Sequence, residues 1–388
     1  MTHPDPFAPA RLGPLTLRNR IVKAATFEGV MTRGAVSDEL VEFHRRVAAG
    51  GVGMTTVAYC AVSMDGRVQR HTLVMDPERI GDLRRLTDAV HAEGAAIAAQ
   101  LGHAGLVANT RSNGMPTMAP STRFSAPAMA RVHGATREQL DRVVDDFVRA
   151  TNVAAEAGFD AVEVHLGHNY LLSSFMSPNL NRRTDEYGGS IANRIAYPRR
   201  VLAAVKEAAP DHMAVTAKFN MADGVDKGLW LDESLPMAKL IEADGHLDAL
   251  QLTGGSSLLN GMYFFRGDVP LKEFRETQPA AVGFGLRFYG PKLFPKYPFE
   301  EGFFLPFARQ FRDELSMPLI LLGGINLRET IEGAMAEGFE FVAMARALLR
   351  EPDLVNRMQA DEGHEGLCVH CNKCLPTIYT GTRCVLAS

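Results

Sequence analysis

Residues 319–350 read LILLGGINLRETIEGAMAEGFEFVAMARALLR, and this stretch contains the unit from which the chain is built. Its two short apolar runs, residues 319–322 and 341–344, have the length and composition of buried β-strands. Residues 327–337, between them, place their apolar side chains at helical spacing. A strand, a helix and a second strand in this order predict two parallel strands joined by a crossover helix.

The same alternation continues through the rest of the chain. Further strands are expected at residues 21–25, 54–58, 95–101, 161–164, 213–218 and 247–252. Further helices are expected at residues 38–49, 80–92, 137–157, 191–208, 232–243, 303–315 and 346–360. Doubly wound sheets also alternate, but eight strands with eight helices favour an α/β fold of the closed (β/α)8 kind, the TIM barrel.

Three long segments interrupt this rhythm: residues 105–134, 173–189 and 254–298. Each follows a predicted strand, so in a barrel all three lie as long loops at the C-terminal face, where active sites form. The third is basic and aromatic (FFRGDVP, then FGLRFYGPKLFPKYPF). We expect it to form an ordered lid or a subunit contact; nothing else in the sequence supports a surface for a partner or lipid.

Length and composition limit the class of protein. The 388 residues suit one barrel with insertions or two ordinary domains. The net charge of -4 does not favour binding to nucleic acid or to an anionic membrane. The N-terminus lacks a secretory pattern, and no apolar run approaches the roughly 20 residues of a membrane helix. We expect a soluble, cytoplasmic protein that binds a small-molecule substrate, with neither nucleic acid nor membrane as partner; assembly as a homo-oligomer stays open.

The end of the fourth predicted strand carries the most reactive group of side chains, Glu163-Val164-His165-Leu166-Gly167-His168-Asn169-Tyr170. Alternate residues of a strand face the same side, so Glu163 and His165 share one orientation, and His168 and Tyr170 lie in the turn beyond. Two neutral imidazoles can bind one carbonyl or nitro oxygen, and a phenol can supply a proton. Chance, or a pair of metal ligands, is the alternative, although helical zinc motifs space their histidines differently.

A second group predicts an anion site after the last two strands. Gly323 and Gly324 allow close backbone approach, and Ala345-Arg346 brings a guanidinium to the start of the final helix, where TIM barrels commonly bind phosphate. Gln100 and Lys218 end two other strands, where an amide and a cation suit the pyrimidine edge of a flavin. A buried lysine needs a partner, and a flavin is one candidate.

With these residues assembled, the sequence resembles the old yellow enzyme family of FMN-dependent ene-reductases. The resemblance runs from Leu12-Gly13-Pro14-Leu15-Thr16-Leu17-Arg18-Asn19-Arg20 to the C-terminal tail. Its most specific part is residues 160–189, within GFDAVEVHLGHNYLLSSFMSPNLNRRTDEYGGSIANR.

The resemblance implies a role for each site residue. His165 and His168 would hold the carbonyl oxygen of an α,β-unsaturated substrate, and Tyr170 would donate a proton to its α-carbon. FMN would be reduced by NAD(P)H as co-substrate and would then reduce the C=C bond. The cofactor-binding residues so implied are Ala25, Thr26, Ala58, Tyr59, Gln100, Lys218, Gly323, Gly324, Ala345 and Arg346.

The sequence departs from the family pattern in places. Lys218 stands where arginine is more frequent, and Phe27 aligns where relatives carry Cys or Thr, with Thr26 beside it. Two alternative functions stay open. One is an oxidative flavoenzyme of the same family, such as an amine demethylase or a desaturating dehydrogenase. The other is a flavin-free TIM-barrel lyase or hydrolase.

The C-terminal tail, residues 361–388, concentrates four of the five cysteines: Cys368, Cys371, Cys374 and Cys384. We predict that it packs on a barrel formed by residues 1–360. The spacing resembles the iron–sulfur segment of the dienoyl-CoA reductase branch of the family, and Asn372 follows the second cysteine as it does there. Cys384 comes closer to Cys374 than that pattern implies. A [4Fe–4S] cluster, zinc and a metal-free tail all stay open.

Overall fold

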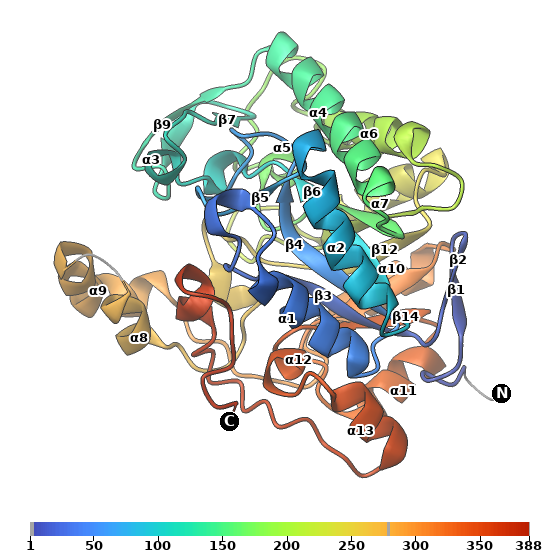
Figure 1. The fold of residues 1–388 in the computed structure, drawn as a ribbon. Helices are drawn as coiled ribbons and strands as arrows, with labels where there is room; N and C mark the ends of the chain where they lie inside the picture. Colours follow the sequence, from blue (N-terminus) through green and yellow to red (C-terminus); the bar gives the residue numbers. More distant parts are fainter. Residues whose placement is uncertain (1–3, 278–279, 388) are drawn as a thin grey trace.

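Eight parallel strands close into a barrel in the computed structural model, which describes residues 4–277 and 280–387 (Figure 1). Around the barrel they are β3 (Ile21–Phe27), β4 (Met54–Ala61), β6 (Ala96–Gly102), β10 (Ala161–Leu166), β11 (Ala214–Asn220), β12 (Ala249–Thr253), β13 (Leu319–Leu322) and β14 (Phe341–Met344). β14 pairs with β3, and β3 pairs with β4, which closes the ring. The predicted TIM barrel is confirmed.

Helices follow the strands as predicted, with one exception. They are α1 (Asp38–Ala49), α2 (Ile80–His91), α4 (Arg137–Glu156), α6 (Ile191–Ala208), α7 (Leu231–Asp244), α10 (Leu305–Glu314) and α11 (Arg328–Ala336). The single helix predicted for residues 346–360 is wrong, because the chain forms α12 (Arg346–Arg350) and α13 (Leu354–Ala360) instead. Pro352 lies between them, and a proline cannot donate the backbone hydrogen bond that would continue the first helix.

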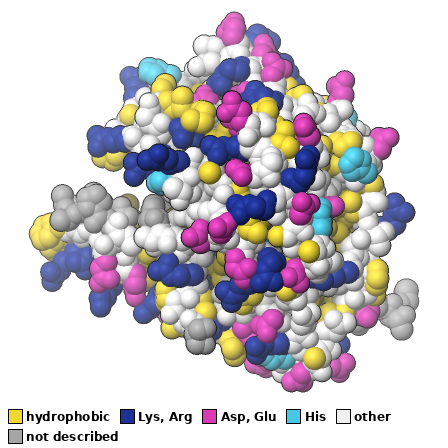
Figure 2. All heavy atoms as spheres, viewed as in Figure 1, with side chains coloured by type: hydrophobic (Ala, Val, Ile, Leu, Met, Phe, Trp, Pro, Cys, Tyr) yellow, Lys and Arg dark blue, Asp and Glu magenta, His cyan; other side chains and the backbone are white. Residues whose placement is uncertain are grey.

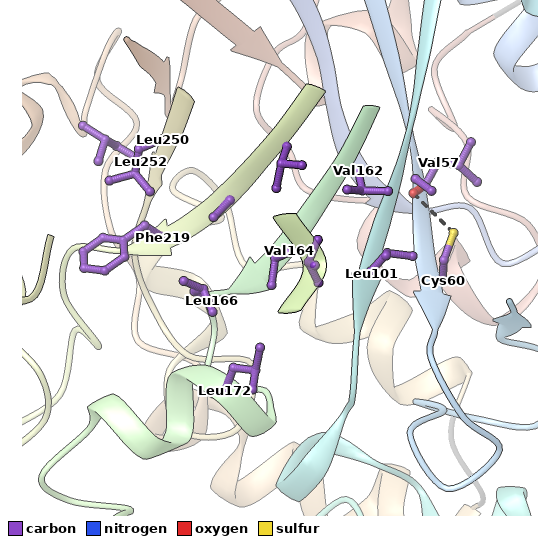
Figure 3. Close-up of a cluster of buried hydrophobic side chains, with 14 of the residues drawn as sticks. Val57, Cys60, Leu101, Val162, Val164, Leu166, Leu172, Phe219, Leu250 and Leu252 are labelled. Carbon is purple, nitrogen blue, oxygen red and sulfur yellow. Dashed lines mark hydrogen bonds between the residues drawn. The ribbon is translucent and has the colours of Figure 1, made fainter. Parts of the chain in front are cut away.

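Strand alternation sorts side chains between two environments. In β10, Val162, Val164 and Leu166 belong to the large apolar cluster that the barrel strands share with the surrounding helices (Figure 3). Glu163 and His165 alternate with these residues and so face the barrel interior. Toward the C-terminal ends of the strands the barrel interior therefore receives polar side chains, while the outer faces of the strands pack in the apolar core.

The opposite end of the barrel is closed by an N-terminal hairpin, β1 (Ala10–Leu12) and β2 (Leu15–Leu17). Leu12 and Leu17 pack there with an interior layer of small side chains from neighbouring strands, Ala98, Ala161, Ala214 and Ala249. This end is packed with apolar side chains, which leaves the C-terminal face for the site.

The three predicted excursions all leave that C-terminal face. Residues 105–134 form η3 (Gly105–Val107), α3 (Thr110–Asn113) and a small sheet of β7 (Met118–Ala119), β8 (Arg123–Ser125) and β9 (Ala130–Gly134). The second excursion, predicted for residues 173–189, begins inside a short helix, α5 (Leu171–Met176). Short elements elsewhere are η1 (Thr32–Gly34), β5 (Leu73–Val74) and η2 (Pro77–Arg79).

The third excursion, residues 254–298, is called the insert below. It contains η4 (Gly261–Tyr263), α8 (Leu271–Glu276) and α9 (Ala280–Leu293), and its positions 278–279 lie outside the described residues. α8 and α9 project from the body of the molecule (Figures 1 and 2). The tail's own short helix, η5 (Leu375–Tyr379), lies against α8. Within the described residues, no helix is long and apolar enough to cross a membrane.

Candidate active site

A sharp turn after β10 brings the predicted catalytic side chains together. His168 and Asn169 both have left-handed backbone angles, with φ of +60° and +59°. Two such residues in succession fold the chain back at the strand end. The ring centroids of His165 and His168 lie 5.2 Å apart, and those of His165 and Tyr170 lie 4.5 Å apart. The expected convergence of two imidazoles and a phenol is therefore present.

A buried carboxylate holds this turn in place. Asp223 accepts hydrogen bonds from the Asn169 side chain (2.9 Å), the Ser177 hydroxyl (2.6 Å) and the Leu229 backbone (2.8 Å). Asn220 donates to the same carboxylate at 2.9 Å and accepts from the backbone N–H of His168 at 3.3 Å. Sequence reasoning missed Asp223, since no motif marks an acidic residue that acts from another loop.

Burial decides the protonation of the three rings. It lowers the pKa of His165 well below its usual range, and the neighbouring His168 and Lys218 lower it further. Burial, together with the charge of Lys218, lowers the pKa of His168 to about 3. Burial raises the pKa of the Tyr170 phenol. At neutral pH the site thus presents two uncharged imidazoles and a protonated phenol.

His165 and His168 differ in their partners. The Nε2 atom of His168 lies 3.0 Å from the Thr253 hydroxyl, and its ring stacks on Phe264 at 4.4 Å. The Nδ1 atom of His165 is buried and has no hydrogen-bond partner among the described residues. A buried ring nitrogen without a partner is costly unless a ligand atom completes it.

One cavity of about 360 Å³ joins these rings to every other residue predicted for the site. Its lining includes Ala25, Thr26, Ala58, Tyr59, Gln100, His165, His168, Tyr170, Lys218, Gly323, Gly324, Ala345 and Arg346. Phe27 lines it as well, beside Thr26, whose hydroxyl contacts the Lys23 ammonium at 3.0 Å. These positions come from seven of the eight barrel strands or the turns after them, so the cavity spans the mouth of the barrel.

The protein itself supplies a partner for Lys218. Its ammonium lies 3.3 Å from Oε1 of Glu163, which also accepts a hydrogen bond from the Gln100 amide at 2.7 Å. The other carboxylate oxygen accepts from Gln251. A carboxylate only accepts, so Glu163 turns the N–H groups of both amides toward itself. The sequence offered a flavin as the candidate partner of Lys218 and missed both this ion pair and Gln251.

Comparison with known proteins identifies the family. Residues 5–252 match the NADH:flavin oxidoreductase / NADH oxidase family. The chain belongs to that family, the old yellow enzymes. It is an FMN-dependent oxidoreductase that uses NADH or NADPH, as the family implies and the names of its relatives agree.

The names of individual relatives indicate different activities. The 4,4'-dithiodibutanoate disulfide reductase of Rhodococcus erythropolis is 73% identical over 383 residues, which is 99% of this chain and 95% of that protein. An NADPH dehydrogenase of Listeria welshimeri is 30% identical over 89% of this chain and 91% of its own length. The old yellow enzyme homologue of Zymomonas mobilis shares the fold, with a TM-score of 0.73 at 22% identity over 98% of this chain and 100% of that one.

The residues that line the cavity of this old yellow enzyme have the chemistry that FMN requires. Near one end, Arg346 uses Nη1 for two protein contacts, whereas its Nε and Nη2 atoms make no hydrogen bond within the described residues. Gly323 and Gly324, with φ of +120° and +76°, give the adjoining turn a backbone that other residues rarely adopt. Gln100 and Lys218 offer an amide and a cation to a flavin ring, and the unpartnered nitrogen of His165 is left for a substrate atom. Arg346 would hold the phosphate, and Gln100 with Lys218 the ring edge; these roles stay predictions.

Aromatic side chains of the insert form one wall of the cavity, together with the tail. The lining from these two segments includes Phe264, Phe265, Phe274, Phe294, His370, Cys374, Leu375, Ile378 and Thr382. The predicted lid is therefore present as a wall, while the predicted subunit contact stays untested. Sequence reasoning missed the contribution of the tail, because only its cysteines stood out.

Three of the tail cysteines, Cys368, Cys371 and Cys374, lie close enough to Arg346 to interact with its charge, and what the cysteines bind stays open. Among the described residues, no group of three or more His, Cys, Asp or Glu side chains is arranged to hold a metal ion. All four tail cysteines are free thiols, and Cys374 lines the cavity. Burial raises the pKa of Cys374 to about 11, with nearby Arg346 lowering it in part.

Proposed function

We propose that this old yellow enzyme reduces small organic disulfides with terminal carboxylates, such as 4,4'-dithiodibutanoate, at the expense of NADH or NADPH. The observation that carries the proposal is the 73% identity with the R. erythropolis disulfide reductase over nearly the whole of both chains. The balanced reaction is R–S–S–R + NAD(P)H + H⁺ → 2 R–SH + NAD(P)⁺.

The side chains of the cavity suit this chemistry. When bound, FMN supplies the two electrons as a hydride equivalent, drawn first from the nicotinamide. The S–S bond breaks, and negative charge develops on the departing sulfur. His165 and His168, both uncharged, can donate N–H groups to that sulfur or to a substrate carboxylate without an opposing positive charge. The aromatic wall around Phe264 is apolar and would limit the access of water to the reacting atoms.

A second candidate substrate is an activated alkene, an α,β-unsaturated carbonyl compound. It is favoured by the placement of Tyr170, whose ring lies 4.5 Å from that of His165. His165 and His168 would hold the carbonyl oxygen as it gains charge, and the Tyr170 phenol would protonate the α-carbon. Both reactions place charge at the histidines, but only the alkene requires a proton on carbon.

An anaerobic two-step experiment separates the substrates. The holoenzyme is reduced with one equivalent of NADH or NADPH and then mixed with 4,4'-dithiodibutanoate, its dimethyl ester or 2-cyclohexenone. Recovery of the flavin absorbance near 450 nm is followed, and products are measured by chromatography. We expect the dicarboxylate to reoxidise the enzyme faster than its ester and to yield two thiols. If 2-cyclohexenone reoxidises the reduced enzyme and the disulfide does not, disulfide reduction is refuted and alkene reduction is supported.

A further inference from the structure

The tail reaches the phosphate end of the cavity through one buried side chain, Asn372, which is 2% exposed. Its amide N–H groups donate to the backbone carbonyls of Phe265 (2.5 Å) and Asp268 (2.9 Å) in the insert. Its carbonyl oxygen accepts a hydrogen bond from Nη1 of Arg346. One side chain therefore joins three segments that are far apart in the sequence.

Arg346 is fixed from two sides by these same segments. The tail provides Asn372, and the insert provides the backbone carbonyl of Arg266, to which Nη1 donates at 2.8 Å. Both contacts use one nitrogen, so the remaining guanidinium N–H groups keep a defined direction. A planar guanidinium binds an anion well only when its orientation is set.

Further contacts join the tail to the insert and to the residue that follows it. The backbone carbonyl of His370 accepts a hydrogen bond from the N–H of Asp268 in the insert at 3.0 Å. The ring of His370 stacks on Phe299, directly after the insert, with centroids 3.3 Å apart. Farther along the tail, the backbone N–H of Thr382 donates at 2.7 Å to the carbonyl of Glu28, just beyond β3. The tail is thus attached on both sides of the cavity that it lines.

We propose that the C-terminal tail helps to retain FMN. Asn372 is the positioning residue: it orients Arg346 toward the FMN phosphate and joins the insert to the tail. This role requires no metal at the cysteines, and it holds for a disulfide or an alkene substrate alike. The chemistry of Asn372 is specific. Two carbonyls need a donor and one guanidinium needs an acceptor, and an amide supplies both.

The backbone at Asn372 guides the choice of variants. Its φ of +55° is a left-handed conformation that asparagine, aspartate and glycine tolerate. Asn372→Gly removes all the side-chain contacts and keeps the backbone. Asn372→Asp keeps an oxygen for Arg346 but places a carboxylate against two carbonyls. Lys373→Ala is the matched control, because Lys373 joins the same tail to the same insert through an exposed ion pair with Glu273 at 3.0 Å.

The test measures dissociation constants of the full-length protein for FMN and for riboflavin, which lacks the phosphate. We expect Asn372→Gly and Asn372→Asp to weaken FMN binding at least tenfold and to change riboflavin binding less than twofold. Lys373→Ala should leave both within twofold. Amide hydrogen exchange at residues 265–268 should rise in the two Asn372 variants only.

A double-mutant cycle with Arg346→Ala completes the test. If Asn372 acts through Arg346, then Asn372→Gly should weaken FMN binding no further once Arg346 is alanine. Equal loss of FMN and riboflavin affinity would indicate general loosening of the site and would overturn the proposal. So would unchanged FMN affinity in Asn372→Gly, or additive losses in the cycle.

Discussion

The barrel rim and the cover over it build the site by different means. The rim consists of interior side chains at the strand ends, such as Glu163, His165 and Lys218, whose directions follow from strand alternation. The cover consists of the insert and the tail, and its central contacts join Asn372 to carbonyls 104 and 107 positions away. The rim therefore carries the chemistry on a rigid wall, whereas the cover depends on a few hydrogen bonds between separate segments.

The largest effect should be a loss of stability when the buried ion pair of the rim, Lys218–Glu163, is broken. Glu163→Ala leaves the Lys218 ammonium without its partner, and removing one member of a buried pair typically costs about 3–5 kcal/mol. Urea denaturation of the full-length protein should show this loss. The double variant Glu163→Gln/Lys218→Met should recover much of it, because it buries no unpaired charge. A single variant as stable as the parent protein would mean that the pair is not a structural support.

The next effect separates chemistry from cofactor retention. His165→Ala/His168→Ala should lower turnover of the oxidising substrate by about 10²- to 10³-fold, because both N–H donors at the developing charge are lost. FMN should stay bound, since neither ring is needed to hold it. Difference spectra with a phenol should lose the long-wavelength band expected for a phenolate beside the flavin. Release of FMN from this variant would contradict the assignment of the two histidines to the substrate.

The same contrast explains what could be predicted from the sequence. Gln100, His165 and Lys218, which were predicted from the ends of three strands, line one cavity. Period-two alternation fixes the direction of their side chains, and the position along each strand fixes their depth in the barrel. The Asp223 support and the Lys218–Glu163 pair could not be predicted, since they depend on how neighbouring strands and loops meet. Asn372 was visible only as a residue beside a cysteine. Two of its partners are backbone carbonyls, and because every residue has one, the sequence does not indicate which carbonyls Asn372 will contact.

A smaller effect tests which substrate the rim serves. Tyr170→Phe removes the phenolic proton and little else from the rim. A thiolate leaves without protonation at neutral pH, whereas a carbon centre must receive a proton. We expect reoxidation by 2-cyclohexenone to slow about 10²-fold and reoxidation by 4,4'-dithiodibutanoate to slow less than about threefold. Stopped-flow absorbance near 450 nm gives both rates, and equal slowing would place Tyr170 in disulfide reduction as well.

The smallest expected effect is that of pH. Burial lowers the pKa of His168 to about 3 and that of His165 well below its usual range. Their active, uncharged forms therefore persist as pH falls through 6.5, where an exposed histidine would gain its proton. Burial also raises the pKa of Tyr170, so the phenol keeps its proton at mildly alkaline pH. The rate of flavin reoxidation should stay constant within about twofold from pH 5.5 to 8.5. A fall below pH 7 with a midpoint near 6.5 would mean that one imidazole is exposed to water, and that the aromatic cover does not shield the rim.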